Sequence, residues 1–347
     1  MNTQEAYMKR CLQLAAKGMG NVAPNPMVGC VIVYQDKIIG EGYHQKYGEA
    51  HAEVNAINAV EDKELLKNAT LYVNLEPCAH YGKTPPCADL IIEHKIHYVI
   101  IGSIDTNSLV AGKGIEKLAK AGIDVKIGVL EKECKELNKR FFTFYDKKRP
   151  YITLKWAQTK NGFIDNKRTE DTIGKALQIT NLESKKLVHK WRSEEQAIMV
   201  GTNTALLDNP QLTVREVNGK NPLRITIDKW LRIPKSYHLF DKSTPTLVFT
   251  AVDTPSVNNL EFVKIDFDND VIMQISNELY KRNIQSLIVE GGELLLKSFI
   301  ESNCWDEARV FISDITIGRG VNAPILNGNP VSKENIKDDK LWIYYKE

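Results

Sequence analysis

The apolar and polar positions of the N-terminal half predict a helix, a hairpin and then helices and strands in turn. Tyr7, Cys11 and Leu14 recur at helical spacing. Apolar runs over 28–34 and 37–43 predict two strands joined by a turn at Gln35-Asp36. Further along, the pattern predicts helices over 51–60, after residue 86, and over 113–120 and 131–138, and strands over 70–75, 98–104 and 124–129. Strands that alternate with helices in this rhythm are typical of a mostly parallel sheet covered by helices.

The alternation resumes after a basic stretch that ends in Pro150, which is typical of a domain boundary. The pattern of the second half predicts helices over 181–192 and 293–300, and strands over 151–157, 197–200, 223–227, 246–250, 286–289 and 308–312. A chain of 347 residues is long enough for two domains that each bury a core. We therefore expect two α/β domains, over residues 1–146 and 150–347.

Charge and composition narrow the class of function. Lys and Arg number 46 against 44 Asp and Glu, so the formal charge of +2 lacks the basic character of a nucleic-acid binder. Residues 1–16 mix charged and apolar positions, unlike a signal peptide, and no later apolar run approaches membrane length. Six cysteines in a chain of this length do not make a disulfide framework. We expect a cytoplasmic enzyme that acts on a small molecule and binds neither nucleic acid nor membrane, and we also expect a homo-oligomer.

Three soft metal ligands and one carboxylate lie close together in the first half. His51, Cys78 and Cys87 offer an imidazole and two thiolates, and Glu53 follows His51 by two positions. Three such ligands leave one position of a tetrahedral zinc ion open for water, and a glutamate nearby can move protons between that water and a leaving amine. His-x-Glu and Pro-Cys-x-x-Cys form the zinc signature of nucleobase deaminases. The pattern therefore predicts one catalytic zinc ion, with Glu53 as the proton carrier.

The spacing of the two cysteines departs from that signature. Eight residues separate Cys78 from Cys87 where the signature has two, so the loop between them must double back. Gly82 and Pro85-Pro86 favour such a turn. Because residues two apart on a regular helix point to different sides, we expect His51 at the very start of its helix, where it and Glu53 can reach one pocket.

A closed, structural zinc site is the alternative interpretation of these residues. It requires a fourth ligand, which His80 could supply, and it leaves Glu53 without a role. The remaining cysteines are expected to be small buried apolar residues: Cys11, Cys30, Cys134 and Cys304.

The second half carries weaker signals. Val289-Glu290-Gly291-Gly292 ends a predicted strand and opens a predicted helix, so its backbone N–H groups can face a phosphate. Gly201-Thr202 follows another apolar strand and offers the same arrangement. A Gly-Gly pair after a strand is more often only a tight turn, and no Gly-x-Gly-x-x-Gly fingerprint is present. Further candidates are charged residues, which more commonly stay solvated: Lys155, Arg192, Asp208 and Arg215.

Several sequence blocks are specific enough to indicate a family. In the first half they are 23–29, His51-Ala52-Glu53, 76–87 and 110–114. In the second half they are Leu154-Lys155, Ile179-Thr180, Asp208-Asn209-Pro210, 212–215 and 289–292. Through these blocks the chain resembles the bifunctional deaminase/reductases of riboflavin biosynthesis over nearly its whole length. The long loop between the two cysteines is typical of that family. The resemblance implies a cytidine-deaminase-like α/β domain followed by a dihydrofolate-reductase-like α/β domain that uses NADPH.

The resemblance also implies a substrate and the residues that hold it. The substrate would be a diaminopyrimidinone carrying a ribosylamine 5-phosphate, deaminated on the ring and then reduced along the sugar. In the first domain the implied substrate residues are Asn25, His44, His80, Lys83, Asp105 and Asn107, with Lys83 suited to a phosphate. In the second they are Lys155, Thr180, Asp208, Arg215 and Glu290, with Asp208 catalytic and with Arg192 and Arg215 as phosphate clamps. The implied cofactor residues are Gly201, Thr202, Gly291 and Gly292.

Three blocks depart from the family pattern. Asp105-Thr106-Asn107-Ser108 stands where the family has Asp-Pro-Asn-Pro, so two prolines that would stiffen the loop are lost. Residues 176–180 lack the hydroxyl and the indole of the family's Ser-x-Trp-Ile-Thr. Asn161-Gly162 replaces the usual Asp-Gly.

Two other functions compete with this interpretation. One is a zinc deaminase of another nucleoside or of a tRNA base, with the second half serving only as a binding domain. The near-neutral charge and the long loop between the cysteines argue against tRNA. The other is an interaction protein with structural zinc, which leaves Glu53 and Asn25 unexplained.

Overall fold

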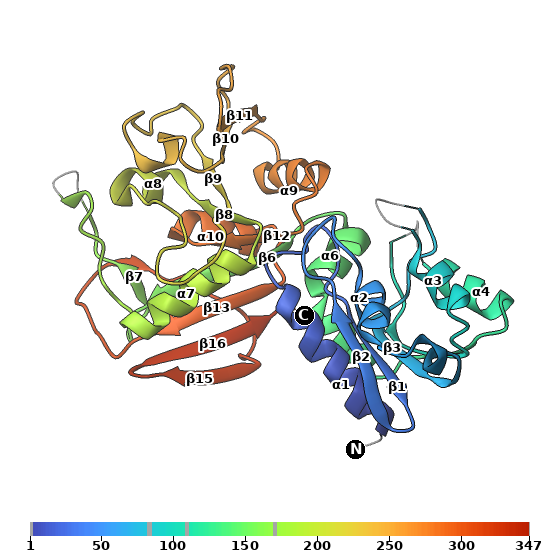
Figure 1. Ribbon diagram of the computed structural model, residues 1–347. Coiled ribbons are helices and arrows are strands. Elements are labelled where there is room, and N and C mark those ends of the chain that lie inside the picture. Colours follow the sequence, from blue (N-terminus) through green and yellow to red (C-terminus); the bar gives the residue numbers. More distant parts are fainter. Residues whose placement is uncertain (1–2, 82–84, 108–110, 169–171, 347) are drawn as a thin grey trace. The chain divides into compact units, whose positions relative to one another are not determined.

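Two compact units make up the chain, Met1–Lys148 and Arg149–Glu347, and both are α/β as predicted (Figure 1). The computed structural model describes residues 3–81, 85–107, 111–168 and 172–346. Among these residues, no helix has both the length and the apolar character that crossing a membrane requires.

The first unit is built on a five-stranded sheet with the order β2-β1-β3-β4-β5. Its strands are β1 (Gly29–Tyr34), β2 (Lys37–Tyr43), β3 (Thr70–Leu75), β4 (Tyr98–Ser103) and β5 (Asp124–Ile127). β3, β4 and β5 are parallel, but β1 is antiparallel to both of its neighbours. The hairpin that we predicted over β1 and β2 is confirmed, and its tight turn at Gln35 and Asp36 has positive φ angles of 48° and 59°. The antiparallel pairing of β1 with β3 is the departure from the mostly parallel sheet that we expected.

Helices cover both faces of this sheet. They are α1 (Thr3–Ala15), α2 (Ala52–Ala59), α3 (Cys87–Glu93), α4 (Lys113–Lys120), α5 (Glu131–Leu137) and α6 (Lys139–Lys147). Successive residues of β1 point to opposite faces, as the pleat requires: Ile32 joins the core under α2, α3 and α4, whereas Val31 packs with α1 and α5. The sequence pattern did not predict α6, which buries Phe141, Phe142 and Phe144.

The second unit is built on a nine-stranded sheet with the order β11-β10-β9-β8-β12-β6-β13-β16-β15. The strands from β11 to β13 in this order are parallel, and β16 and β15 continue the sheet in antiparallel fashion. The predicted strands are β6 (Tyr151–Gln158), β8 (Ala197–Val200), β9 (Leu223–Ile227), β10 (Thr246–Thr250), β12 (Ser286–Val289) and β13 (Glu307–Ile312). The strands that the pattern missed are β11 (Leu260–Lys264), β15 (Ser332–Ile336), β16 (Asp339–Tyr345) and the separate pair β7 (Phe163–Asp165) and β14 (Val321–Asn322).

Four helices flank this second sheet, two on each face. They are α7 (Leu182–Glu194), α8 (Thr202–Asp208), α9 (Val271–Lys281) and α10 (Glu293–Glu301). Apolar side chains of α9 and α10 pack in one core, and those of α7 and α8 pack in the other. Because β8, β9 and β12 are parallel neighbours, their carboxyl ends meet at one edge of the sheet, where α8 and α10 begin.

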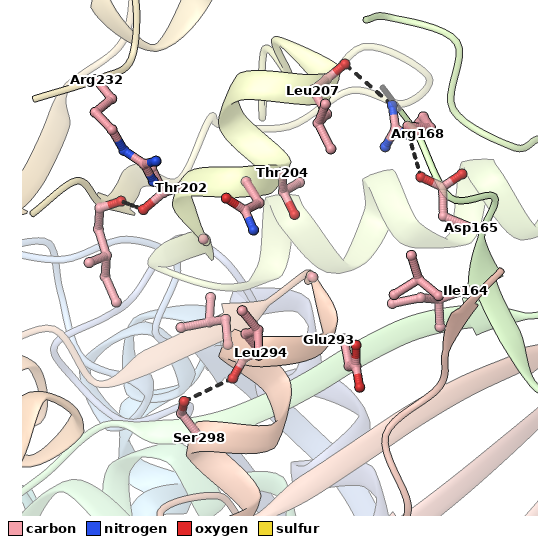
Figure 2. Close-up of a pocket in the computed structure, with 16 residues that line it drawn as sticks. Ile164, Asp165, Arg168, Thr202, Thr204, Leu207, Arg232, Glu293, Leu294 and Ser298 are labelled. Atoms are coloured by element: carbon pink, nitrogen blue, oxygen red, sulfur yellow. Dashed lines mark hydrogen bonds and ion pairs between the residues drawn. The ribbon is translucent and has the colours of Figure 1, made fainter. Parts of the chain in front are cut away.

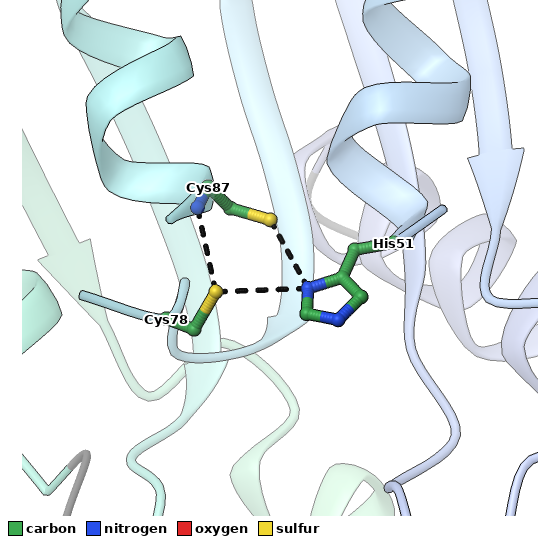
Figure 3. Close-up of side chains that lie close together, drawn as sticks. All are labelled: His51, Cys78 and Cys87. Atoms are coloured by element: carbon green, nitrogen blue, oxygen red, sulfur yellow. Dashed lines mark hydrogen bonds between the residues drawn. The ribbon is translucent and has the colours of Figure 1, made fainter. Parts of the chain in front are cut away.

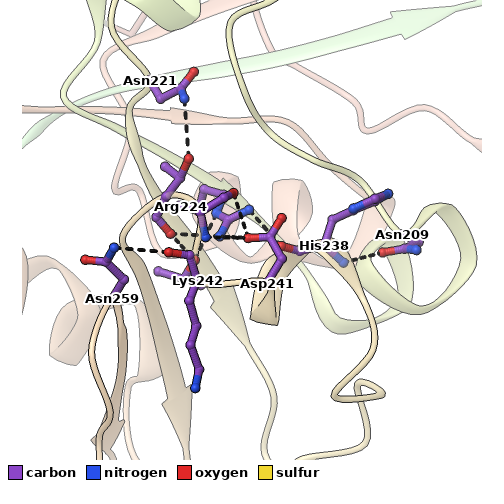
Figure 4. Close-up of polar contacts among 10 residues, drawn as sticks. Asn209, Asn221, Arg224, His238, Asp241, Lys242 and Asn259 are labelled. Carbon is purple, nitrogen blue, oxygen red and sulfur yellow. Dashed lines mark hydrogen bonds and ion pairs between the residues drawn. The ribbon is translucent and has the colours of Figure 1, made fainter.

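A fully buried arginine fixes the loop between β9 and β10 (Figure 4). Arg224 donates from Nε to Thr246 Oγ1 at 2.9 Å and from its terminal nitrogens to the carbonyls of His238 and Thr244, each at 2.7 Å. One of these nitrogens also lies 2.9 Å from Asp241 Oδ1. Arg224 thus pairs several polar groups of the loop at once.

Replacing Arg224 with Met should destabilise the second unit by about 3–5 kcal/mol, because the carbonyls and the carboxylate lose a buried charged donor. The free energy of unfolding, measured by denaturant titration of the full chain, checks this value. The exposed Arg319→Met is the matched control and should change stability by no more than about 0.5 kcal/mol. A loss below about 1 kcal/mol for Arg224→Met would contradict the assigned role.

Candidate functional site

The imidazole of His51 and the thiols of Cys78 and Cys87 converge on one point in the first unit (Figure 3). His51 is the N-cap of α2, Cys78 follows the end of β3, and Cys87 is the first residue of α3. His51 Nδ1 lies 3.6 Å from Cys78 Sγ and 3.3 Å from Cys87 Sγ. The three ligand atoms all lie within 4.8 Å of one another. His51 stands at the start of its helix, as we expected from the spacing.

These distances fit a zinc ion. Zinc bonds of about 2.3 Å to sulfur and 2.1 Å to nitrogen place two tetrahedral ligands roughly 3.6 Å apart. Hydrogen bonds from Cys87 and His51 lower the pKa of the Cys78 thiol to about 4. The hydrogen bond with Cys78 and burial raise the pKa of Cys87. Cys78 is thus the more readily ionised of the two thiols, and a bound zinc ion would hold both as thiolates.

The two ends of the loop between the cysteines meet, as we expected. The backbone N–H of Cys87 donates to Cys78 Sγ at 3.3 Å, and the N–H of Ala88 donates to the Cys78 carbonyl at 3.1 Å. The start of α3 therefore lies directly against Cys78. The N–H of Cys87 at this helix start points at the sulfur and favours the thiolate form.

Glu53 lies in the first turn of α2, and its side chain is buried. Burial raises the pKa of the Glu53 carboxyl, although the nearby His51 lowers it in part. The carboxyl also forms a hydrogen bond with Cys87. A raised pKa makes this carboxyl group a stronger base than an exposed one. Its place beside the metal ligands therefore suits it to carry a proton.

His44 is held in one tautomer by its hydrogen bonds. Its Nδ1 lies 3.0 Å from the Ala50 carbonyl, which can only accept, so Nδ1 carries the proton. Burial lowers the pKa of His44 and keeps the ring neutral. Nε2 is therefore an acceptor, and it receives the Asn25 amide N–H at 3.1 Å. The His44 ring meets the His51 ring edge to face at 5.3 Å, so Asn25 and His44 lie beside the metal ligands.

Glu76 fixes the loop that carries Asp105 and Asn107. Its buried carboxylate accepts backbone N–H groups from Gly112 at 3.0 Å and Gly114 at 2.9 Å, and from Asp105 at 3.3 Å. Gly114 must be glycine, because a Cβ atom there would lie 2.0 Å from the Pro77 carbonyl oxygen. Sequence analysis missed the role of Glu76, whose only signal was its place beside Pro77-Cys78.

Asp105 and Asn107 lie together in this loop. The Asn107 N–H donates to Asp105 Oδ1 at 2.7 Å. Burial, followed by the charges of Glu76 and Cys78, raises the pKa of Asp105 to about 6. The influence of Cys78 on this carboxyl indicates that the loop faces the metal ligands.

His80 and Lys83 are not part of this cluster. His80 is exposed and is not among the three metal-ligating residues that meet in the described part of the first unit. Lys83 lies outside the described residues. The closed-site interpretation, which needed His80 as a fourth ligand, therefore has no support in this arrangement.

In the second unit, Glu290 is the centre of a cluster of charges. It follows β12 and forms a bidentate pair with Arg192, at 2.9 and 2.7 Å. Burial would raise the pKa of Glu290, but the charges of Arg192 and Lys155 outweigh burial and lower the pKa to about 2. Burial lowers the pKa of Lys155 on β6. Arg192, which we expected on a phosphate, forms this pair with Glu290 in the structure.

Arg215 differs from Arg192 because its guanidinium is exposed and takes part in none of the salt bridges among the described residues. It donates to Thr213 Oγ1 at 2.9 Å, and its backbone N–H donates to His189 Nδ1 at 3.1 Å. Burial, followed by the charges of Arg192 and Arg215, lowers the pKa of His189 to about 4. A neutral His189 thus anchors the backbone that presents Arg215.

Asp208 ends α8 and is paired in a way that the sequence did not reveal. Arg168 lies 2.5 Å from Asp208 Oδ1 and 2.5 Å from Asp165 Oδ2. Asp165 Oδ1 also accepts the N–H of Leu177, which ties the altered 176–180 block to β7. Thr180 is half-buried and directly precedes Asn181, the N-cap of α7.

A pocket of about 640 Å³ opens at the starts of α8 and α10 (Figure 2). Gly201, Thr202 and Gly292 line it, as do Arg168 and Arg232. Gly291 is adjacent, and its φ of +112° is a conformation that favours glycine. The two glycine-containing strand ends expected to bind the cofactor are therefore brought together, since the Gly201 N–H donates to the Gly291 carbonyl at 3.1 Å.

Comparison with known proteins finds relatives of both units. The model of the cytidine and deoxycytidylate deaminase zinc-binding region matches residues 1–103, and the model of the RibD C-terminal domain matches residues 150–346. The riboflavin biosynthesis protein RibD of Aquifex aeolicus is 42% identical over 98% of this chain and 97% of its own length. The RibD protein of Escherichia coli is 35% identical over 90% of this chain and 88% of its own length.

Solved structures resemble the whole chain as well. The diaminohydroxyphosphoribosylaminopyrimidine deaminase/5-amino-6-(5-phosphoribosylamino)uracil reductase of Thermotoga maritima is 37% identical, with a TM-score of 0.88 over 98% of both chains. RibD of Acinetobacter baumannii is 29% identical, with a TM-score of 0.87 over 99% of this chain and 98% of its own.

Replacing Cys87 with Ser should weaken zinc binding by more than about 100-fold, since changes to groups that only support a ligand already cost 10- to 100-fold. Metal analysis of the purified full chain measures the zinc content. Cys304→Ser, which alters a buried cysteine of the second unit, is the matched control and should keep its zinc. Full zinc content in Cys87→Ser would exclude Cys87 as a ligand.

Proposed function

The chain belongs to the RibD family of riboflavin-biosynthesis proteins, and from this membership we propose which of its residues serve each of its two reactions. The protein is a bifunctional enzyme, a deaminase and a reductase, that uses zinc and NADPH. We assign to it the substrates for which the Thermotoga relative is named. A diaminohydroxyphosphoribosylaminopyrimidine is first deaminated on its ring, and the ribosyl group of the product is then reduced to a ribityl chain.

The deaminase is assigned to residues 1–146 and the reductase to residues 150–347. The family matches over 1–103 and 150–346 and the division of the chain after Lys148 support these boundaries. The convergence of His51, Cys78 and Cys87 beside buried Glu53 is the observation that carries the deaminase assignment.

We assign His51 Nδ1 and the sulfurs of Cys78 and Cys87 as the zinc ligands. Zinc held there supplies a Lewis acid that activates a water molecule. Glu53 accepts the proton that this water loses as its oxygen bonds to the ring carbon. Glu53 passes this proton to the ring nitrogen. It then takes the second proton from the added hydroxyl and delivers it to the amine nitrogen as the carbon–nitrogen bond breaks, the carbonyl forms and ammonia leaves.

The neighbours of this group are assigned to the substrate. Asn25 and His44 lie beside His51 in fixed orientations, so they can recognise the ring without reorganisation. Asp105 and Asn107 are held by Glu76 on the side of Cys78 and are also assigned to the ring or ribose. His80 and Lys83 are retained from the sequence as further substrate residues, with Lys83 for the phosphate.

In the reductase, NADPH supplies the hydride for C1 of the sugar. We assign Lys155 and Glu290 to the sugar, because their opposite charges lie close enough for each to shift the pKa of the other. Arg192 is assigned as the residue that positions Glu290, through the bidentate pair described above. Thr180 remains a substrate residue, and Asp208 a catalytic one held by Arg168.

Arg215 is assigned to the phosphate of the substrate, since its guanidinium is exposed and outside the salt bridges of the described residues. The pocket at Gly201, Thr202, Gly291 and Gly292 is assigned to the cofactor. Backbone N–H groups at the two helix starts suit the pyrophosphate.

The competing activity, deamination of another nucleoside or a tRNA base, would leave the second unit with only a binding role. The buried Lys155, Arg192 and Glu290 cluster speaks against that role, because a surface that merely binds has no need of desolvated paired charges. We further propose a cytoplasmic location, in keeping with six free cysteines, and a homo-oligomer.

Glu53→Gln should keep the zinc and the fold but lower kcat of deamination roughly 100- to 10,000-fold, because an amide cannot carry the proton. Turnover with the diaminopyrimidine substrate and metal analysis of the same sample measure both properties. Glu49→Gln, which changes an exposed carboxylate on the preceding loop, should behave as the wild type. An active Glu53→Gln enzyme would remove this residue from the mechanism, and a zinc-free one would give it a structural role.

Arg215→Ala should raise KM for the deaminated substrate roughly 10- to 100-fold, because a charge-assisted contact to phosphate is lost. NADPH affinity and deamination should not change. Steady-state reduction assays with the full chain measure the effect, and Lys220→Ala, which removes an exposed charge nearby, serves as the control. An equal effect of both variants would mean that Arg215 contributes only to the general charge of this surface.

A further inference from the structure

Two buried asparagines clamp the backbone of Met27, which lies in the loop before β1. Asn138 Oδ1 accepts the N–H of Met27 at 2.8 Å, and Asn138 Nδ2 donates to the Met27 carbonyl at 2.9 Å. Asn74 donates to the same carbonyl at 3.0 Å and accepts the N–H of Gly29 at 2.7 Å. Both backbone polar groups of Met27 are therefore paired with side chains from segments 47 and 111 residues away, as a neighbouring strand would pair them.

The side chain of Asn138 is available for this clamp because its backbone is paired elsewhere. Asn138 lies between α5 and α6, where its N–H donates to the Cys134 carbonyl at 3.3 Å and its carbonyl accepts the N–H of Phe142 at 3.0 Å. The preceding residue, Leu137, packs against the apolar cluster that includes the Met27 side chain. The side chain and the backbone of Met27 are thus both held from the junction of α5 and α6.

The clamped residue lies between two links to His44. On one side of Met27, the Val28 carbonyl accepts the N–H of His44 at 2.9 Å. On the other side, the Asn25 amide donates to His44 Nε2 at 3.1 Å. Residues 19–28 form turns and extended backbone without a helix or strand of their own. The place of Asn25 beside the metal ligands therefore depends on side-chain contacts, and the clamp on Met27 is one of them.

We propose that Asn138 is a positioning residue of the deaminase, which holds Asn25 in place through the backbone of Met27. This assignment rests on the proposed role of Asn25 in recognising the substrate ring. An amide that is already fixed meets the ring without first being ordered, whereas release of Met27 lets Asn25 move away from His44. The junction of α5 and α6 thereby contributes to deamination, although Asn138 is buried and is not itself assigned to the substrate.

A double-mutant cycle in the zinc-loaded full chain tests this proposal. Asn138→Ala should lower kcat/KM of deamination roughly 10- to 100-fold, since a displacement of about 1 Å can cost this much. In the Asn25→Ala background the same substitution should change kcat/KM by less than about twofold, because its effect passes through Asn25. Zinc content and NADPH-dependent reduction should equal those of the wild type. Asn58→Ala, which shortens an exposed side chain of α2, is the matched control and should keep full activity.

Other outcomes overturn the proposal in distinguishable ways. If the effects of the two substitutions add, Asn138 acts on deamination by another route. If Asn138→Ala loses zinc, the clamp supports the metal ligands, and if it deaminates like the wild type, the clamp is dispensable. If Asn25→Ala itself deaminates like the wild type, the proposed role of Asn25 is wrong and that of Asn138 falls with it. Asn138→Asp keeps the size of the side chain and the acceptor for Met27, so the same cycle with this variant decides the question if Asn138→Ala does not fold.

Discussion

Parallel strand pairing is the constraint on which both sites depend, because it brings the carboxyl ends of neighbouring strands to one edge of a sheet. In the first unit, β3 and β4 are parallel neighbours, and Cys78 and Asp105 follow their ends. In the second, β8, β12 and β9 are neighbours, and their ends lead into Gly201, Glu290 and Asp228. Residues far apart in the chain therefore meet at one end of each sheet, and contacts such as those of Glu76 then fix their loops.

Charge balance separates the residues that organise the second unit from those that remain available to ligands. Glu290 is matched by Arg192 and Lys155, and Arg168 is matched by Asp165 and Asp208. These buried charges would be costly alone, and each has a partner. Arg215 and Arg232, in contrast, are exposed and take no part in the ion pairs of the described residues. The anionic groups of a ligand would thus meet guanidinium groups that the fold itself does not use.

The metal cluster could be predicted from the sequence, because His, Cys and Glu side chains are recognisable as zinc ligands and a proton carrier. Their spacing also required His51 to stand at the start of a helix. The α/β class was predicted from the alternation of strands and helices, and the family and NADPH were predicted from short sequence blocks. The matches to relatives confirm all three. The hairpin of β1 and β2 was predicted, but the antiparallel pairing of β1 with β3 was not, because local pattern does not show which distant strand pairs with a hairpin. α6 was missed because charged residues at both of its ends made the segment resemble a linker, although three of its phenylalanines are buried. The pairing of Arg192 with Glu290 joins residues on different elements, which no spacing reveals.

The strand order has a consequence for synthesis of the chain on the ribosome. Every residue assigned to zinc, the proton or the substrate in the first site lies before residue 115, and its sheet is complete once β5 has emerged. The second sheet is different, since β6, the first strand made, lies between β12 and β13, which are among the last. β8 likewise waits for β12 at its side. The strands of the deaminase unit can therefore pair as soon as they are made, whereas β6 and β8 of the reductase unit keep unpaired edges until β12 and β13 follow.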